Sequence, residues 1–61
     1  MQSIKVKDLK VGMETDSGCV EDIAVLTDGK IDVTFSIYDY DCGENEYFPC
    51  ILDSNEVVNL I

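Results

Sequence analysis

Residues 19–40, CVEDIAVLTDGKIDVTFSIYDY, decide the fold of this 61-residue chain. Two runs rich in β-branched and aromatic residues, 19–26 and 30–40, flank Thr27-Asp28-Gly29. An Asp-Gly pair between two such runs is a strong β-hairpin signal. Apolar and polar side chains alternate along the second run, which predicts a strand with its inner face at Ile31, Val33, Phe35 and Ile37.

The register of this hairpin follows from parity, because directly paired residues share a face. Val25 opposite Ile31 and Ile23 opposite Val33 require a three-residue loop with Gly29 in the left-handed region. Cys19 then also belongs to the inner face.

The same register sets Glu21 opposite Phe35, which is an apolar position. A β-bulge at Glu21-Asp22 relieves such a mismatch, because it adds one residue to one strand. We therefore expect a bulge or bend at this point.

A second hairpin is predicted between 30–40 and 46–52. The apolar face of 46–52 is even-numbered (Phe48, Cys50, Leu52), so the loop must hold an even number of residues. A loop over 42–45 pairs Asp41 with Glu46, Tyr40 with Tyr47, Ile37 with Cys50 and Phe35 with Leu52. Pro49 cannot donate a ladder hydrogen bond, so this strand is expected at a sheet edge or bulged.

The rest of the chain supplies shorter strands. Residues 4–7 alternate apolar and polar, 8–14 form a turn into a second short strand, and 57–61 form a last strand that pairs back with the first. No segment has helical periodicity. We predict an all-β fold with one acidic β-barrel domain over 1–61. It is a small SH3-like barrel or a strongly twisted meander of five to six short antiparallel strands.

Asp8-Leu9-Lys10-Val11-Gly12-Met13, a following Gly turn, the Asp-Gly hairpin and the final Glu56-Val57-Val58-Asn59-Leu60 together resemble small SH3-like barrels. The strand plan is similar to the KOW-type domain at the N-terminus of elongation factor P, and to small barrel proteins of uncharacterised bacterial and phage reading frames. The resemblance implies the fold and no functional residue. The loop that carries a modified Lys or Arg in those translation factors is acidic here.

Charge restricts the partners. Thirteen Asp and Glu face four basic residues, all Lys, for a net charge of −9, and Lys30 is the only cation after residue 10. Nucleic acids and anionic membranes are bound through Lys and Arg, so direct binding to either is not expected. A basic protein surface or a cation is the natural counterpart, although negative charge also simply keeps a small protein soluble.

The N-terminus has no apolar signal-peptide core, and the longest apolar runs are too short to span a membrane. The three cysteines (Cys19, Cys42, Cys50) cannot all pair within one chain, which fits a reducing compartment. We predict a cytoplasmic protein, and a Cys42–Cys50 disulfide is not expected.

Catalysis and metal binding find little support. The chain has no His to shuttle protons near neutral pH, and we predict no enzyme activity and no cofactor. Zinc commonly needs a Cys-x-x-Cys pair, which is missing. Residues 39–46 hold four carboxylates without EF-hand spacing, which predicts only weak divalent cation association.

Three tyrosines are predicted to point outward beside this acidic turn, and exposed tyrosines are favoured at protein interfaces. The candidate partner-binding residues are Tyr38, Tyr40, Asp41, Glu44, Glu46 and Tyr47. They predict a monomeric protein-interaction module, for example an inhibitor of phage or host-factor type or a DNA mimic. Two alternatives stay open: tyrosines that only brace the sheet, and a structural or assembly subunit that forms homo-oligomers.

Overall fold

The computed structural model describes residues 2–61, which form one six-stranded antiparallel sheet of order β1-β6-β2-β3-β4-β5. The elements are β1 (Gln2–Lys5), the one-turn 3-10 helix η1 (Val6–Asp8), β2 (Glu14–Thr15), β3 (Gly18–Val25), β4 (Lys30–Asp39), β5 (Glu44–Asp53) and β6 (Val57–Leu60). The predicted all-β class is confirmed in its second form, a twisted meander. The sheet does not close into a barrel within the described residues, because β1 and β5 are its two edges.

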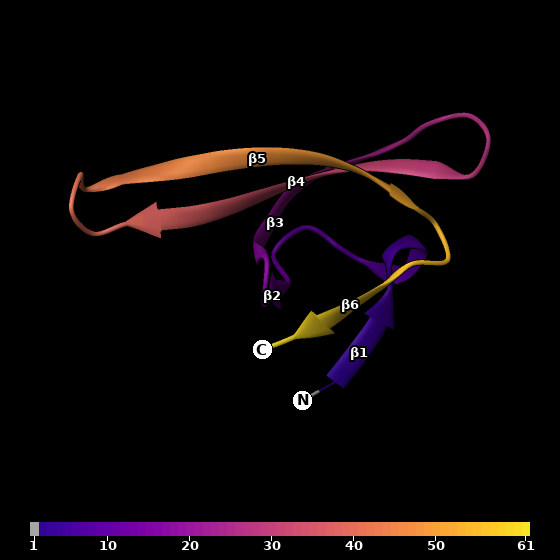
Figure 1. The fold of residues 1–61 in the computed structure, drawn as a ribbon, viewed down its shortest axis with the longest axis horizontal. Helices are drawn as coiled ribbons and strands as arrows, with labels where there is room; N and C mark the ends of the chain where they lie inside the picture. Colours follow the sequence, from indigo (N-terminus) through magenta and orange to yellow (C-terminus); the bar gives the residue numbers. More distant parts are fainter. Residues whose placement is uncertain (1) are drawn as a thin grey trace.

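The core lies where the twisted sheet folds over itself. Figure 1 shows the β4–β5 hairpin along the top of the view and β1 and β6 below it, with η1 between them. The buried apolar side chains come from the η1 region and from the central strands: Val6, Leu9, Val20, Ile31, Val33 and Phe35. This core is small, and several long apolar side chains elsewhere stay exposed.

The N-terminal strand predicted over residues 4–7 ends two residues early, at Lys5, after which η1 begins. The backbone N–H of Val6 donates to the carbonyl of Glu56 (2.8 Å), and that of Lys7 donates to Ser54 (3.1 Å). These bonds tie the helical turn to the segment before β6, and Val6 is thereby buried. The predicted pairing of the first and last strands is confirmed, with Ile4 opposite Val58.

The first hairpin has the predicted register, with Val25 opposite Ile31 and Ile23 opposite Val33. The three-residue loop is also confirmed, since the N–H of Leu26 donates to the carbonyl of Lys30 (2.9 Å). Asp28 as well as Gly29 takes a positive φ in this loop, at 64° and 74°.

The predicted bulge is confirmed at Glu21, where the register shifts between Val20 and Asp22. It also corrects one prediction. A bulge exchanges the two faces of a strand, so Val20, not Cys19, enters the core. Val20 is 1% exposed, and Cys19 lies half-buried opposite Ser36.

The second hairpin has the predicted parity, but its predicted register is wrong by four positions. Ile37 pairs with Glu46 and Phe35 with Phe48, so the loop covers residues 40–43. Tyr47 therefore lies opposite Ser36 and not opposite Tyr40, and Asp41 lies in the loop instead of opposite Glu46.

Gly43 explains this loop. It takes a φ of 70° as the last residue before β5, and its N–H donates to the carbonyl of Asp39 (2.7 Å). Positive φ is favoured for glycine, so the chain turns back into the strand at this residue. The predicted loop 42–45 had placed the same glycine in second position.

Strand β5 is an edge, as Pro49 predicted. The N–H of Ser54 donates to the carbonyl of Gly29 (2.9 Å), so the backbone N–H and C=O groups of the even-numbered residues of β5 point toward β4. Because the direction of these groups alternates along a strand, the backbone nitrogen of Pro49 points to the free edge. The missing N–H therefore breaks the row of donors that an added strand would need.

Candidate functional site

The end of the β4–β5 hairpin extends beyond the rest of the sheet. Pairing of β4 with β3 ends at Ser36, opposite Cys19, and residues 37–46 pair only with one another. We call residues 37–46 the arm, and Figure 1 shows it at the left, with its loop furthest from the core. A two-stranded ribbon is marginally stable in water by itself, so the arm depends on the strands at its base.

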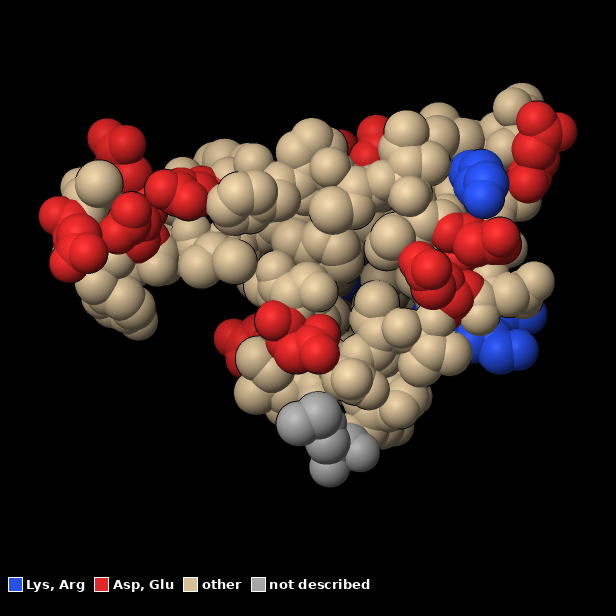
Figure 2. Space-filling model, in the orientation of Figure 1, with Lys and Arg blue, Asp and Glu red and all other residues tan. Residues whose placement is uncertain are grey.

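All the charged side chains of the arm are carboxylates. It carries Asp39, Asp41, Glu44 and Glu46, and no Lys or Arg occurs from residue 31 to residue 61. Figure 2 shows these carboxylates gathered at one end of the molecule, with the Lys side chains at the opposite end. Among residues 2–61 the only ion pair is Lys30 with Asp53 (3.5 Å), far from the arm. An exposed pair of this kind contributes little to stability.

The three tyrosines are exposed, although in a different arrangement from the predicted one. Tyr40 lies in the arm loop and is 88% exposed, while Tyr38 and Tyr47 are about half exposed. The rings of Tyr38 and Tyr40 meet edge to face, with centroids 4.8 Å apart. Tyr47 lies at the base of the arm. The structure thus brings Tyr38 and Tyr40 together on the arm that carries Asp41, Glu44 and Glu46.

Asp39 shapes the arm loop and was missed among the candidate site residues. Its carboxylate accepts hydrogen bonds from the backbone N–H groups of Asp41 (2.9 Å) and Cys42 (3.4 Å). These bonds, the one from Asp41 first, lower the pKa of Asp39 below its usual 3.8. Asp side chains commonly accept a hydrogen bond from the backbone N–H two residues on in a turn, and this preference is the signal for the role of Asp39.

The Asp39 carboxylate is expected to titrate below pH 3.8, because the hydrogen-bonded charged form is favoured. A folded-state pKa below the unfolded one contributes stability above the unfolded pKa, and this contribution is lost as the pH falls through the folded pKa. Carboxyl carbon shifts measured by NMR between pH 2 and 6 give the midpoint. Asp39→Asn keeps an acceptor oxygen and should leave the Asp41 and Cys42 amide shifts near their wild-type values, whereas Asp39→Ala should move both. A midpoint at or above 3.8 contradicts this role.

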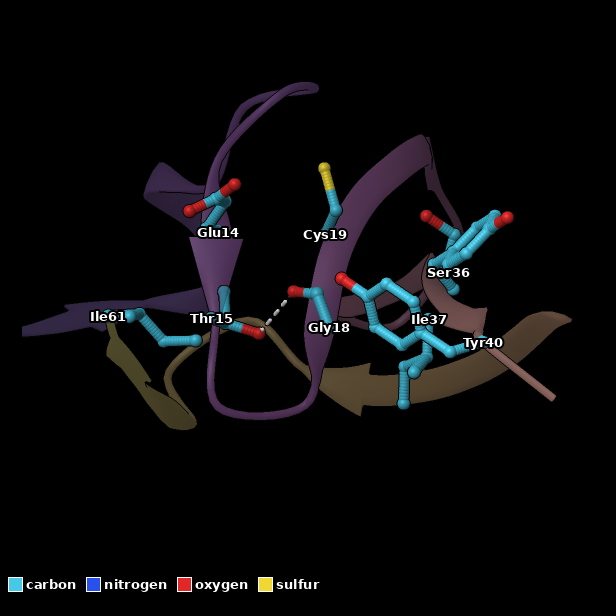
Figure 3. A pocket seen from close by; sticks show the side chains of 9 residues that line it. Glu14, Thr15, Gly18, Cys19, Ser36, Ile37, Tyr40 and Ile61 are labelled. Carbon is cyan, nitrogen blue, oxygen red and sulfur yellow. Dashed lines mark hydrogen bonds between the residues drawn. The ribbon is translucent and has the colours of Figure 1, made fainter. Parts of the chain in front are cut away.

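A groove lies between the arm and the end of β2. It has a volume of about 370 Å³ and is open to solvent, and its walls come from β2, the start of β3, the end of β4 and the C-terminal residue. Figure 3 shows Ile61 and Thr15 on one side, Ile37 and Tyr40 on the other, and Gly18 between them. Of the residues that line this groove, only Tyr38 and Tyr40 are among the site residues predicted from the sequence.

The floor of the groove is held by a tight turn between β2 and β3. The buried hydroxyl of Thr15 donates to the carbonyl of Gly18 (2.8 Å) and accepts from the N–H of Ser17 (3.1 Å). On the arm side, the hydroxyl of Ser36 donates to the carboxylate of Glu21 (2.7 Å). The bulge at Glu21 thus brings this carboxylate within reach of Ser36, which lines the groove.

Other chemistry is sparse in the part of the chain that the structure describes. The three cysteines are free, with Cys42 exposed and the other two half-buried. No group of three or more Cys, Asp or Glu side chains within residues 2–61 is arranged to hold a metal ion. No helix in this range is long and apolar enough to cross a membrane.

No family model, no curated protein and no solved structure matches this chain.

Proposed function

We propose that this chain is a small acidic protein-interaction module whose arm docks on a basic protein surface, without catalytic activity of its own. One observation carries the proposal: a two-stranded arm projects beyond the core with four carboxylates, two exposed tyrosines and no cation. Charge on such a projection meets a partner first, and complementary charge raises the rate of association.

The apolar surface of the arm supports the same proposal. Ile37 is 49% exposed on the face that continues the core, and Phe48, its diagonal neighbour at the arm base, is 43% exposed. Tyr38 and Tyr47 are exposed on the opposite face. Contiguous exposed apolar surface rimmed by charge is characteristic of interaction sites. Tyrosine rings also add cation–π contacts when the partner presents Lys or Arg.

Deca-lysine is a defined probe of this proposal, with binding followed by backbone amide shifts. The arm amides are expected to move first, and raising the salt from 0.1 M to 1 M should abolish binding, because the Debye length falls from about 10 Å to about 3 Å. The double variant Tyr40→Ala plus Tyr47→Ala should bind about tenfold more weakly, since each ring contributes a cation–π contact.

Asp28→Asn is the matched control. It removes a carboxylate at the opposite hairpin tip, and Asn tolerates the positive φ of 64° found there. This variant should bind deca-lysine nearly as well as the wild type. Two results would contradict the proposal. One is amide shifts of similar size near every carboxylate of the chain. The other is an equal loss of deca-lysine affinity in Asp28→Asn and in the double variant. Competition by duplex DNA for a captured basic protein would identify the nucleic-acid-mimic version.

A second candidate function is assembly of copies of this chain. The outer face of β5 carries an exposed row of Tyr47, Pro49 and Ile51. Since Pro49 interrupts the free edge, copies would meet through this face and not by strand addition. Light scattering after size exclusion separates the candidates. A dimer that Ile51→Ser dissociates supports assembly, and a monomer at millimolar concentration supports the module.

A further inference from the structure

We infer that the groove between the arm and β2 receives an arginine side chain of the basic partner. This inference rests on the proposed function and adds a specific contact to it. The groove volume of about 370 Å³ lies at the low end of ligand pockets, roughly 300–1,000 Å³. A helix with its side chains is about 10–12 Å wide and needs more room than this volume offers, whereas one long side chain fits.

The groove offers a separate contact for each part of an arginine. Ile37 and Ile61 line opposite sides, and apolar walls of this kind accept the methylene stem of a long cationic side chain. Tyr40 presents an almost fully exposed ring beside them. A guanidinium group stacks on an aromatic face, and its planar fork can also pair with a carboxylate.

Glu14 supplies that carboxylate. It lies on β2 at the groove wall, and it forms no ion pair with any cation in residues 2–61. Figure 2 shows that carboxylates also gather over the β2 end, across the hollow from the arm tip. The groove therefore has apolar walls between two anionic borders, which is complementary to a side chain with an apolar stem and a cationic end.

The occupant is a different protein and not a second copy. This chain contains no Arg, and its four Lys lie at residues 5, 7, 10 and 30. Two copies with a net charge of −9 each also repel one another. Arginine is expected over lysine because the compact ammonium group is more strongly hydrated and cannot stack.

Two probes of equal charge, deca-arginine and deca-lysine, test the inference in NMR titrations of the whole chain. Deca-arginine should bind about fivefold more tightly than deca-lysine, and it alone should shift the Gly18 and Ile61 amides, which lie in the groove but outside the arm. In Tyr40→Leu, deca-arginine and deca-lysine should bind with about equal affinity, because the substitution removes the aromatic face on which a guanidinium stacks. Tyr40→Phe keeps the ring and should retain the preference.

Glu14→Gln should weaken deca-arginine binding about threefold, and the control Asp28→Asn should not. Both probes binding at the arm with equal affinity, and no Gly18 or Ile61 shifts, would overturn the groove inference and leave the proposed function standing. Neither probe shifting the arm amides would overturn both. All these substitutions are at exposed positions, so the variants should fold.

Discussion

Gly18→Ala is expected to leave a large fraction of the molecules unfolded at 25 °C. Gly18 begins β3 with a φ of 128°, a conformation that residues with a side chain rarely adopt. A Cβ atom at this position would lie 2.7 Å from the carbonyl oxygen of Ser36 and 3.1 Å from Cγ1 of Ile37. The first contact is with backbone, so β4 itself must move to accept a methyl group.

The expected loss is about 3 kcal/mol, from backbone strain of roughly 1–3 kcal/mol plus the displaced strand. A core of this size rarely supplies more than roughly 3–5 kcal/mol, so little stability would remain. Urea unfolding followed by circular dichroism measures the loss. Gly12→Ala is the matched control, because Gly12 has a φ of 99° but open space around it. Equal losses in the two variants would show that the contact with Ser36 is unimportant.

The same close approach builds the groove. Gly18 lets β3 begin against the carbonyl of Ser36, and β4 then continues without a partner as the arm. A larger residue here would fill the space between Thr15 and Ile37. The glycine therefore serves the stability of the sheet and the shape of the site together.

The first hairpin was predictable in detail because two signals complement each other. The Asp28-Gly29 pair locates the turn, the alternation along 31–37 selects the three-residue loop and its register, and the misplaced Glu21 then requires the bulge that the structure contains. What the sequence reading missed was the consequence of that bulge. One inserted residue turns Val20 inward and Cys19 outward, which an uninterrupted parity count cannot show.

The second hairpin was not predictable to the same degree, since parity restricts a register only to every second position. Loops over 40–43 and 42–45 are both even. The choice between them depends on the left-handed backbone of Gly43 and on the hydrogen bonds that Asp39 accepts from the loop. Both are local backbone preferences that apolar alternation does not encode.

The candidate site was predictable only in part, for a related reason. The acidic, tyrosine-bearing hairpin is local in sequence, so composition identifies it. The groove joins Glu14, Gly18 and Ile61 to the arm, and these come from separate segments. Their proximity depends on Thr15 pairing with Leu60 in β6, a long-range contact with no local signal.

Phe35→Ala is expected to cost about 3–5 kcal/mol, the usual range for a buried phenylalanine. Phe35 is 3% exposed and lies in the core opposite Val20 on one side and Phe48 on the other. The loss matches the whole stability expected of so small a core, so the variant should be largely unfolded without denaturant. A thermal melt with no cooperative transition, and amide shifts collapsed to the unfolded range, are the expected results.

Phe48→Ala is the matched control, with the same change one strand away. Phe48 faces Phe35 across the pair but is 43% exposed, so its removal should cost about 1 kcal/mol and leave a folded protein. It should nevertheless weaken deca-arginine binding if the partner covers the apolar face at the arm base. The two phenylalanines thus separate the roles of the sheet: one side chain holds the fold and its neighbour is left for a partner. Equal stability losses in the two variants would mean that the arm base is buried in solution and would remove the exposed apolar surface on which the docking proposal depends.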